Sequence, residues 1–294
     1  MVKSARRISK GDRALEIAVF IIMTLLMVIF LYPMWETLVR SFSTQETANT
    51  FGIKLWPEEF SVDSYKYVFR NDDFLIGFKN SVIRTVAGSF LAVLFTYCGG
   101  YALSRKDLPG RGIITFYVVL TMFISAGLIP TYLNIRNLGM INTYWALILP
   151  GAVSAWNLTI CRNFIQSLPY DLEESAMIDG AHPLTIVFKI VFPLSMPILA
   201  VLTLWTAVGQ WNSWFDSMIY TPDNNMTVLQ LVVRRMIVSS NDESSVVLSA
   251  SKADVTSTTI KCATIMVSTI PILCVYPFLQ KYFVQGIMVG ALKG

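Results

Sequence analysis

The sequence predicts an all-α membrane protein with six transmembrane helices. Of its 294 residues, 54% are hydrophobic and only 14% are charged, which is far more apolar than an ordinary soluble domain. Stretches without Asp, Glu, Lys or Arg that can cross about 30 Å of hydrocarbon, roughly 20 residues each, occur six times. They are apolar around their whole circumference, whereas buried helices of a soluble protein would be shorter and amphipathic.

We expect the whole chain, 1–294, to form a single transmembrane domain. The predicted spans cover about 16–38, 82–104, 112–135, 140–161, 187–213 and 261–281. The first span is too long for the apolar region of a signal peptide, and no small-residue cleavage site follows it. We therefore expect it to remain as an anchor.

Five prolines are expected to interrupt the spans. They are Pro130, Pro150, Pro193, Pro197 and Pro271. Prolines in buried helices are tolerated where neighbouring groups or water satisfy the freed carbonyl groups, which is common along a transport pathway.

Basic residues at the ends of the spans predict their orientation. Lys3, Arg6, Arg7, Lys10 and Arg13 precede the first span, and Arg105, Lys106 and Arg111 fill the link between the second and third. Basic flanks favour the cytoplasmic side of a membrane. Six spans then return the C-terminus to the cytoplasm and place the link between the fourth and fifth spans there too.

Two longer segments are expected on the outer side. Residues 40–79 contain an aromatic cluster between Trp56 and Phe69, which we interpret mainly as interfacial anchors. Residues 216–261 contain a helical pattern over 226–238, followed by the polar tract SSNDESS. The tract is typical of a loop, either as a solvated connector or as a docking element for an external partner.

Several classes of function are disfavoured by what the sequence lacks. The cysteines Cys98, Cys161, Cys262 and Cys274 have no C-x-x-C spacing, and His182 is the single histidine, which argues against a metal site or a disulfide framework. A net charge of +4 without a basic, aromatic-rich run gives no nucleic-acid surface.

Neither ATP hydrolysis nor ion coupling has the residues it needs within this chain. No G-x-x-x-x-G-K-[ST] phosphate-binding loop is present, so any ATP must be bound by a partner. The predicted spans also lack an acidic residue or histidine near mid-membrane, which disfavours an ion-coupled carrier and an intramembrane hydrolase.

The most distinctive segment is a polar helix expected over about 171–182. Pro169 prevents an earlier start, Asp171 and Glu174 stand at the N-cap and third helical positions, and Gly180 offers a C-terminal cap. Together these signals predict a short rigid helix on the cytoplasmic side.

The spacing around this helix resembles a known coupling loop. The sequence ESAMIDGAHPLTIVFKIVFP resembles the loop by which permeases of bacterial ATP-binding-cassette (ABC) importers contact their ATPase subunits. Further resemblance extends over NSVIRTVAG, GLIPTYLNIRNLGMINTYWALILP, GQWNSWFDSMIY and the C-terminal YFVQGIMVGALKG. Ser175 and Phe192 replace the usual alanine and leucine, small departures that leave the contacts possible. The chain is most similar to maltose-type (type I) carbohydrate permeases, especially the branch that imports complex oligosaccharides.

This resemblance implies a multi-pass permease of the bacterial cytoplasmic (inner) membrane that is not itself an enzyme. Its implied partners are a homologous second permease, two ABC ATPase subunits that bind ATP and Mg, and an extracytoplasmic solute-binding protein. The implied solute is an oligosaccharide from polysaccharide breakdown, moved by alternating access. An ABC permease for another solute and an ion-coupled carrier are the alternatives.

The resemblance also implies two contact regions for the ATPases. The coupling residues would be Glu174, Ser175, Ala176, Asp179, Gly180, Ala181 and His182. Glu174 can meet a basic residue of the ATPase or only cap its own helix. The tail residues Gly290, Lys293 and Gly294 would insert between the ATPases, the alternative being a frayed end with one snorkelling lysine.

Solute binding calls for aromatic faces and amide groups, which sugars use for stacking and hydrogen bonding. Six residues in the second half of the chain supply both: Trp156, Asn157, Trp205, Gln210, Trp211 and Asn212. Helix packing or interfacial anchoring accounts for the same residues equally well.

Overall fold

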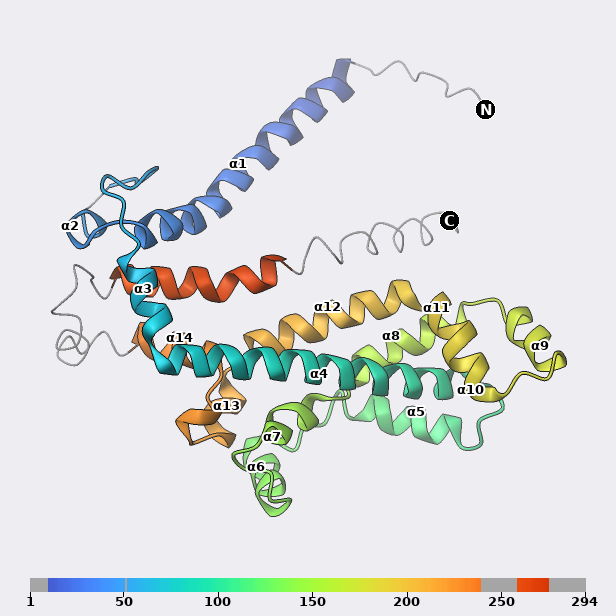
Figure 1. Ribbon diagram of the computed structural model, residues 1–294. Coiled ribbons are helices and arrows are strands. Elements are labelled where there is room, and N and C mark those ends of the chain that lie inside the picture. The colour runs from blue at the N-terminus through green and yellow to red at the C-terminus, as the bar shows by residue number, and fades with distance from the viewer. Residues whose placement is uncertain (1–9, 51, 239–257, 275–294) are drawn as a thin grey trace. The chain divides into compact units, whose positions relative to one another are not determined.

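The computed structural model describes residues 10–50, 52–238 and 258–274, and it is helical (Figure 1). Over these ranges it has no strand, only an isolated antiparallel bridge between Ser43 and Phe60. The predicted all-α class is therefore confirmed for the part described. The chain divides into two compact units, Met1–Phe69 with Ser239–Val267 and Arg70–Val238 with Ser268–Gly294.

The first unit is dominated by the long helix α1 (Lys10–Ser41), which contains the predicted span 16–38. In its apolar stretch, Leu15–Ser41, the most hydrophobic window is 0% buried, so apolar side chains are exposed all round. Such a surface suits lipid or the helices of other subunits. Pro33 is tolerated inside the helix. The unit also includes α2 (Gln45–Ala48) and α3 (Asp63–Arg70).

The segment between α1 and α3 folds back on the end of α1. The Trp35 indole donates to the carbonyl oxygen of Leu55 at 2.9 Å. Phe42 stacks on Phe60 with ring centroids 5.2 Å apart, and its centroid lies 4.7 Å from that of Tyr65. Residues 42–65 are thus held at the end of α1 by aromatic contacts and by the Trp35 hydrogen bond.

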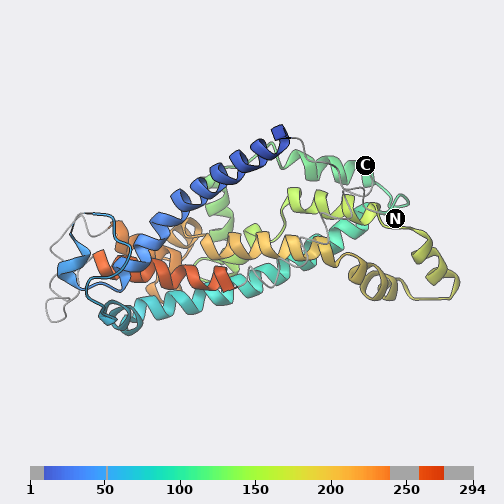
Figure 2. The same cartoon turned by 90° about the horizontal axis from the view of Figure 1, so that it is seen from above.

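The second unit is built around α4 (Asp72–Ser104), which includes the predicted span 82–104. Helices α8 (Ala155–Gln166) and α12 (Met196–Asn212) pack along it, as Figures 1 and 2 show for α12. A glycine permits the close approach of α8 to α4. A Cβ added at Gly100 would lie 3.1 Å from the Cys161 sulfur and 3.2 Å from the backbone nitrogen of Arg162.

Two predicted spans are bent near prolines, as expected, whereas Pro271 lies inside the continuous helix Thr258–Cys274 and does not interrupt it. In the first, α7 (Tyr144–Ile148) and η1 (Leu149–Gly151) meet α8 at 51°, with Pro150 beside the break. In the second, the segment Pro183–Leu194 meets α12 at 79°. That segment comprises α10 (Pro183–Thr185), the π-helix η2 (Ile186–Val191) and α11 (Phe192–Leu194).

Counting spans in the described residues gives two helices long and apolar enough to cross a membrane, or four if each bent pair is one span. The third predicted span, 112–135, differs from a continuous helix. It consists of α5 (Arg111–Leu120) and α6 (Leu128–Asn137), separated by residues 121–127. Gly127, at φ 81°, ends this gap, a backbone conformation that an α-helix excludes. The predicted span 261–281 is described as a helix over Thr258–Cys274, and its remainder lies outside the described residues.

The unit continues after α12 with α13 (Phe215–Tyr220), η3 (Asn224–Met226) and α14 (Leu229–Val238). The helix expected over 226–238 is thus confirmed from residue 229 onward, whereas the SSNDESS tract lies outside the described residues. Helix α14 is held to the start of α4, because the Leu229 amide donates to the Ser81 hydroxyl at 2.8 Å. The Asn80 amide group adds bonds to the carbonyl oxygens of Asn225 and Thr227.

Candidate functional site

The predicted coupling helix is α9 (Asp171–Ile178), which lies beyond the C-terminal end of α4 in both ribbon views (Figures 1 and 2). Its start differs from the expectation. The N-cap is Tyr170, which makes no side-chain capping bond, so Asp171 as N-cap is wrong and Asp171 is the first helical residue. Three carboxylates, of Asp171, Glu173 and Glu174, fill the first turn, where the helix dipole favours negative charge.

The end of α9 agrees with the prediction for Gly180. This residue has φ 76°, and its amide donates to the Met177 carbonyl oxygen at 3.1 Å. The Ala181 amide donates to the Ala176 carbonyl oxygen at 2.9 Å. These two bonds form a Schellman motif. Ala176 and Ala181 also pack against the unit's apolar core, so they support α9 from inside.

The outer surface of α9 combines acidic and apolar side chains. Among the predicted coupling residues, Glu174, Ser175, Asp179 and His182 are exposed. Ile178 is 81% exposed and Leu184 61% exposed, although both are large apolar residues in a polar loop. Exposed apolar side chains of this kind mark surfaces that bind a partner.

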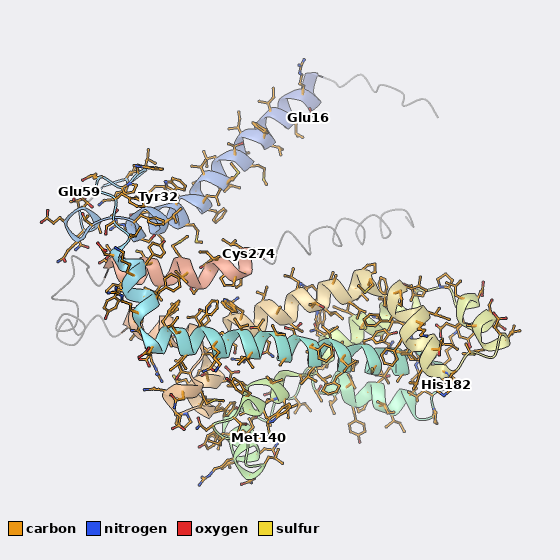
Figure 3. The ribbon with its side chains drawn as sticks, viewed as in Figure 1. Glu16, Tyr32, Glu59, Met140, His182 and Cys274 are labelled. Atoms are coloured by element: carbon orange, nitrogen blue, oxygen red, sulfur yellow. The ribbon has the colours of Figure 1, made fainter. Side chains whose placement is uncertain are left out.

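His182 occupies a turn. Figure 3 labels His182 in the loop between α9 and α10. Its ring nitrogen Nδ1 accepts a hydrogen bond from the Leu184 amide at 3.3 Å, which makes His182 the N-cap of α10. Within the described residues, no group of three His, Cys, Asp or Glu side chains is placed to hold a metal ion.

A buried ion pair that the sequence analysis missed joins α9 to α4. Glu173 is 4% exposed, and its carboxylate accepts a bond from the Arg105 guanidinium at 2.5 Å. The Tyr101 hydroxyl donates to the other carboxylate oxygen at 3.1 Å. Arg105 and Glu173 are 68 residues apart, so only the fold brings them together.

A second missed pair lies deeper in the unit. Arg84 of α4 is 2% exposed and forms an ion pair with Asp216 of α13. The same guanidinium donates to the Gln210 side-chain oxygen at 2.7 Å and to the carbonyl oxygens of Ser213 at 3.2 Å and Leu147 at 3.3 Å. It therefore connects four helical segments around the end of α12.

The six candidate solute residues do not share one environment. Gln210 is engaged by Arg84, and Trp211 is 5% exposed, with its indole nitrogen donating to the Ser268 carbonyl oxygen at 3.0 Å. Helix packing accounts for these two in this structure. Trp156 is 58% exposed, Trp205 46% exposed and Asn212 is exposed, whereas Asn157 is half-buried in the first turn of α8.

A cavity of about 180 Å³ lies between α4, α12 and the end of the helix Thr258–Cys274. Trp211 contributes to its wall, and so does Thr85, whose buried hydroxyl has no hydrogen-bond partner. Pockets for drug-sized ligands span about 300–1,000 Å³. The cavity is therefore too small and too apolar for an oligosaccharide. The predicted tail residues Gly290, Lys293 and Gly294 lie outside the described residues.

Comparison with known proteins gives full-length relatives, although no family model matches the chain. The polygalacturonan/rhamnogalacturonan transport system permease protein YtcP of Bacillus subtilis is 39% identical over 96% of this chain and 99% of its own length. The galactooligosaccharides transport system permease protein GanQ of the same species is 30% identical over 94% of each chain.

The fold is also found in a solved structure. One chain of a bacterial ABC transporter involved in import of the acidic polysaccharide alginate superposes with a TM-score of 0.89 and 30% sequence identity. The superposition covers 94% of this chain and 98% of that chain. This chain therefore belongs to the family of integral-membrane permease proteins of bacterial ABC carbohydrate transport systems.

Proposed function

We propose that this permease imports oligosaccharides released from acidic polysaccharides. The observation that carries the proposal is the 39% identity, over nearly the whole of both chains, to a permease named for polygalacturonan and rhamnogalacturonan transport. The structurally similar transporter that imports alginate supports the same solute class, because alginate is also an acidic polysaccharide. The solutes of both proteins carry carboxylates on their sugar rings.

In the proposed complex the chain pairs with a homologous second permease, two ATPase subunits and an extracytoplasmic solute-binding protein. A related alginate ABC transporter, 18% identical with a TM-score of 0.60, was solved with a periplasmic protein that carries an alginate pentasaccharide. This neighbour supports a solute-binding protein as a partner in the proposed complex. ATP and Mg bind to the ATPases, and this chain carries out no chemical step.

The topology we propose has six spans, with the two units acting together as one permease domain over residues 1–294. The N-terminus, the loop that carries α9 and the C-terminus lie in the cytoplasm. The basic residues around the first three spans support this orientation.

Helix α9 is proposed as the coupling helix that docks into a groove of the ATPase. Its first turn is acidic, and the apolar side chains of Ile178 and Leu184 are exposed for contact. Glu174 then meets a basic residue of the ATPase. When ATP closes the ATPase dimer, α9 moves with it, and the spans open outward to receive solute.

The C-terminal tail is proposed as a second contact with the ATPases. Residues Gly290, Lys293 and Gly294 follow the last predicted span closely, and a bound tail adds contacts at high effective concentration. Deleting residues 289–294 should lower ATP hydrolysis or complex stability. If assembly, ATP hydrolysis and uptake were unchanged, the tail would be a frayed end that makes no contact with the ATPases.

Uptake into proteoliposomes that contain the whole complex tests the proposed function. We expect ATP-dependent uptake of oligogalacturonate delivered by the solute-binding protein, unaffected by ionophores that collapse proton and sodium gradients. Uptake that needs an ion gradient and no ATP would show an ion-coupled carrier instead. ATP-dependent uptake of a neutral oligosaccharide or a peptide, with none of oligogalacturonate, would overturn the proposed solute class.

A further inference from the structure

Three side chains near the end of α4 stand at a spacing of four residues. They are Tyr97, Tyr101 and Arg105, of which the last is the C-cap of the helix. Residues four apart lie above one another on the same face of a helix. The Arg105 guanidinium lies 4.2 Å from the centroid of the Tyr101 ring, so the two side chains are stacked. We call Tyr97, Tyr101 and Arg105 the α4 ladder.

Each member of the α4 ladder bonds to the chain that surrounds and follows α9. Arg105 and Tyr101 both donate to the Glu173 carboxylate, at 2.5 and 3.1 Å. The Tyr97 hydroxyl donates to the carbonyl oxygen of Val187 in the π-helix η2, at 2.5 Å. The ladder therefore holds both α9 and the start of the bent fifth span.

Tyr97 and Glu173 are buried, and Tyr101 and Arg105 are half-buried. The side chains of Arg105 and Glu173 are only 18% and 6% exposed, and Tyr97 is 0% exposed. Tyr170, next to α9, adds its ring centroid 5.7 Å from the Arg105 guanidinium. Removing one partner of a buried ion pair leaves an uncompensated charge, so such a pair resists separation. The α4 ladder and Glu173 should move together.

Helix α9 also has an exposed surface, which does not contact the α4 ladder. Glu174 follows Glu173 directly, yet it is exposed, whereas Glu173 points to the ladder and is 4% exposed. Two adjacent carboxylates thus face different ways. Only Glu174 is free to meet an ATPase, while Glu173 connects α9 to the core of its own chain.

We propose that Glu173 and the α4 ladder form the rigid connection that passes movement of α9 to α4, with Glu173 as a positioning residue for coupling. The inference rests on the proposed role of α9 as the coupling helix. Helices α8, α12 and α14 all pack on α4, so displacement of α4 reaches most of the second unit. The covalent route from α9 to α12 is less direct, because it passes a π-helix and a 79° bend.

The test uses the reconstituted complex with its solute-binding protein, and measures oligosaccharide molecules imported per ATP hydrolysed. In Glu173→Gln, we expect assembly and ATP hydrolysis to persist while this ratio falls clearly below that of the wild-type complex. A residue that only stabilises the fold would lower the amount of complex and leave the ratio unchanged.

Two further variants test whether the effect of Glu173→Gln comes from losing its contact with the α4 ladder or only from losing a negative charge. Tyr101→Phe keeps the ring under Arg105 and removes one bond to Glu173, so it should lower the ratio less than Glu173→Gln. The exchange of charges in Glu173→Arg with Arg105→Glu should recover part of the ratio, because the ion pair can form again. If Glu173→Gln fails to assemble, Tyr101→Phe decides the question, since an unchanged ratio in that variant overturns the proposal.

Glu174→Lys distinguishes this inference from the proposed role of α9. An unchanged ratio in assembled Glu173→Gln, together with loss of solute-stimulated ATP hydrolysis in Glu174→Lys, overturns the ladder and leaves α9 as the coupling helix. Wild-type behaviour of both variants overturns the coupling role of α9 as well.

Discussion

Arg84 of α4 and Asp216 of α13 form a buried ion pair in which the guanidinium has no N–H group to spare. Its five N–H donors are taken up by Gln210, by the carbonyl oxygens of Ser213 and Leu147, and by the two oxygens of Asp216. Asp216 accepts further bonds from the Ser213 hydroxyl at 3.0 Å and the Ser217 amide at 2.9 Å. In this structure Arg84 therefore joins helices and leaves no donor for a solute.

Replacing Arg84 should lower stability strongly. Arg84→Gln leaves the Asp216 carboxylate without its cation, and breaking a buried pair in this way costs about 3–5 kcal/mol. We expect a clearly lower midpoint temperature of unfolding for the detergent-solubilised permease. The exposed Arg136 offers a matched control, and Arg136→Gln should change stability by no more than about 0.5 kcal/mol.

The double variant Arg84→Met with Asp216→Leu should be less destabilised than either single variant, because it removes both charges together. Destabilisation of the double variant equal to the sum of the two single effects would contradict the ion pair.

The contact of α4 with α8 depends on Gly100. A side chain at this position meets the backbone nitrogen of Arg162 at 3.2 Å, and backbone cannot move aside as a flexible side chain can. Gly100→Val should therefore destabilise the permease by about 1–3 kcal/mol, the usual cost of overpacking.

Gly112 supplies the comparison for Gly100, because a Cβ there has no atom within 4 Å. Gly112→Val should be tolerated in the same thermal unfolding measurement. Equal stability of the two variants would show that α4 and α8 do not approach closely at Gly100.

The C-terminal glycine of α9 should matter for coupling. Gly180→Ala places a side chain at φ 76°, where non-glycine residues pay roughly 1–2 kcal/mol, although no neighbouring atom blocks it. We expect a partial loss of solute-stimulated ATP hydrolysis with normal membrane insertion. Gly180→Asn should retain more activity, because asparagine adopts this conformation more readily. The reverse order of the two variants would contradict a role for the left-handed backbone.

The sequence was sufficient for the helical class and for the apolar stretches of the two longest helices, although α1 and α4 both begin before the predicted spans 16–38 and 82–104. Apolar composition marks α1 and α4, and Pro150 and Pro193 lie at or near the two bends. The composition of residues 112–135 did not predict the break between α5 and α6, because an uncharged run has the same composition whether its helix is continuous or interrupted. There the backbone at Gly127 decides the outcome.

In the candidate site, too, the features set by neighbouring residues could be predicted from the sequence, whereas contacts between distant residues could not. Gly180 was identified from a local signal, since a glycine after a polar helix predicts a C-terminal cap. Glu173 and Arg84 were not, because their partners are 68 and 132 residues away and single charges near predicted spans have many possible roles. Tertiary packing alone distinguishes buried Glu173 from exposed Glu174.

The predicted orientation can be checked by labelling single cysteines in intact cells with a membrane-impermeant reagent. In a background without native cysteines, a cysteine at exposed Glu58, in the predicted outer segment, should react readily. A cysteine at exposed Ser175 in α9 should react only after the cells are opened. Labelling of Ser175→Cys in intact cells, with none of Glu58→Cys, would reverse the proposed topology.

Substitution of two tryptophans distinguishes a residue that contacts the solute from a residue that only packs between helices. Trp205 is 46% exposed on α12, so Trp205→Ala should raise the solute concentration needed for half-maximal uptake and leave the unfolding temperature nearly unchanged. Trp211 is buried, bonds to the Ser268 carbonyl oxygen and meets Phe78 edge to face with centroids 5.9 Å apart. Trp211→Ala should therefore destabilise the permease by about 3–5 kcal/mol. If Trp205→Ala changed only the unfolding temperature, Trp205 would be a packing residue and the solute pathway would lie elsewhere.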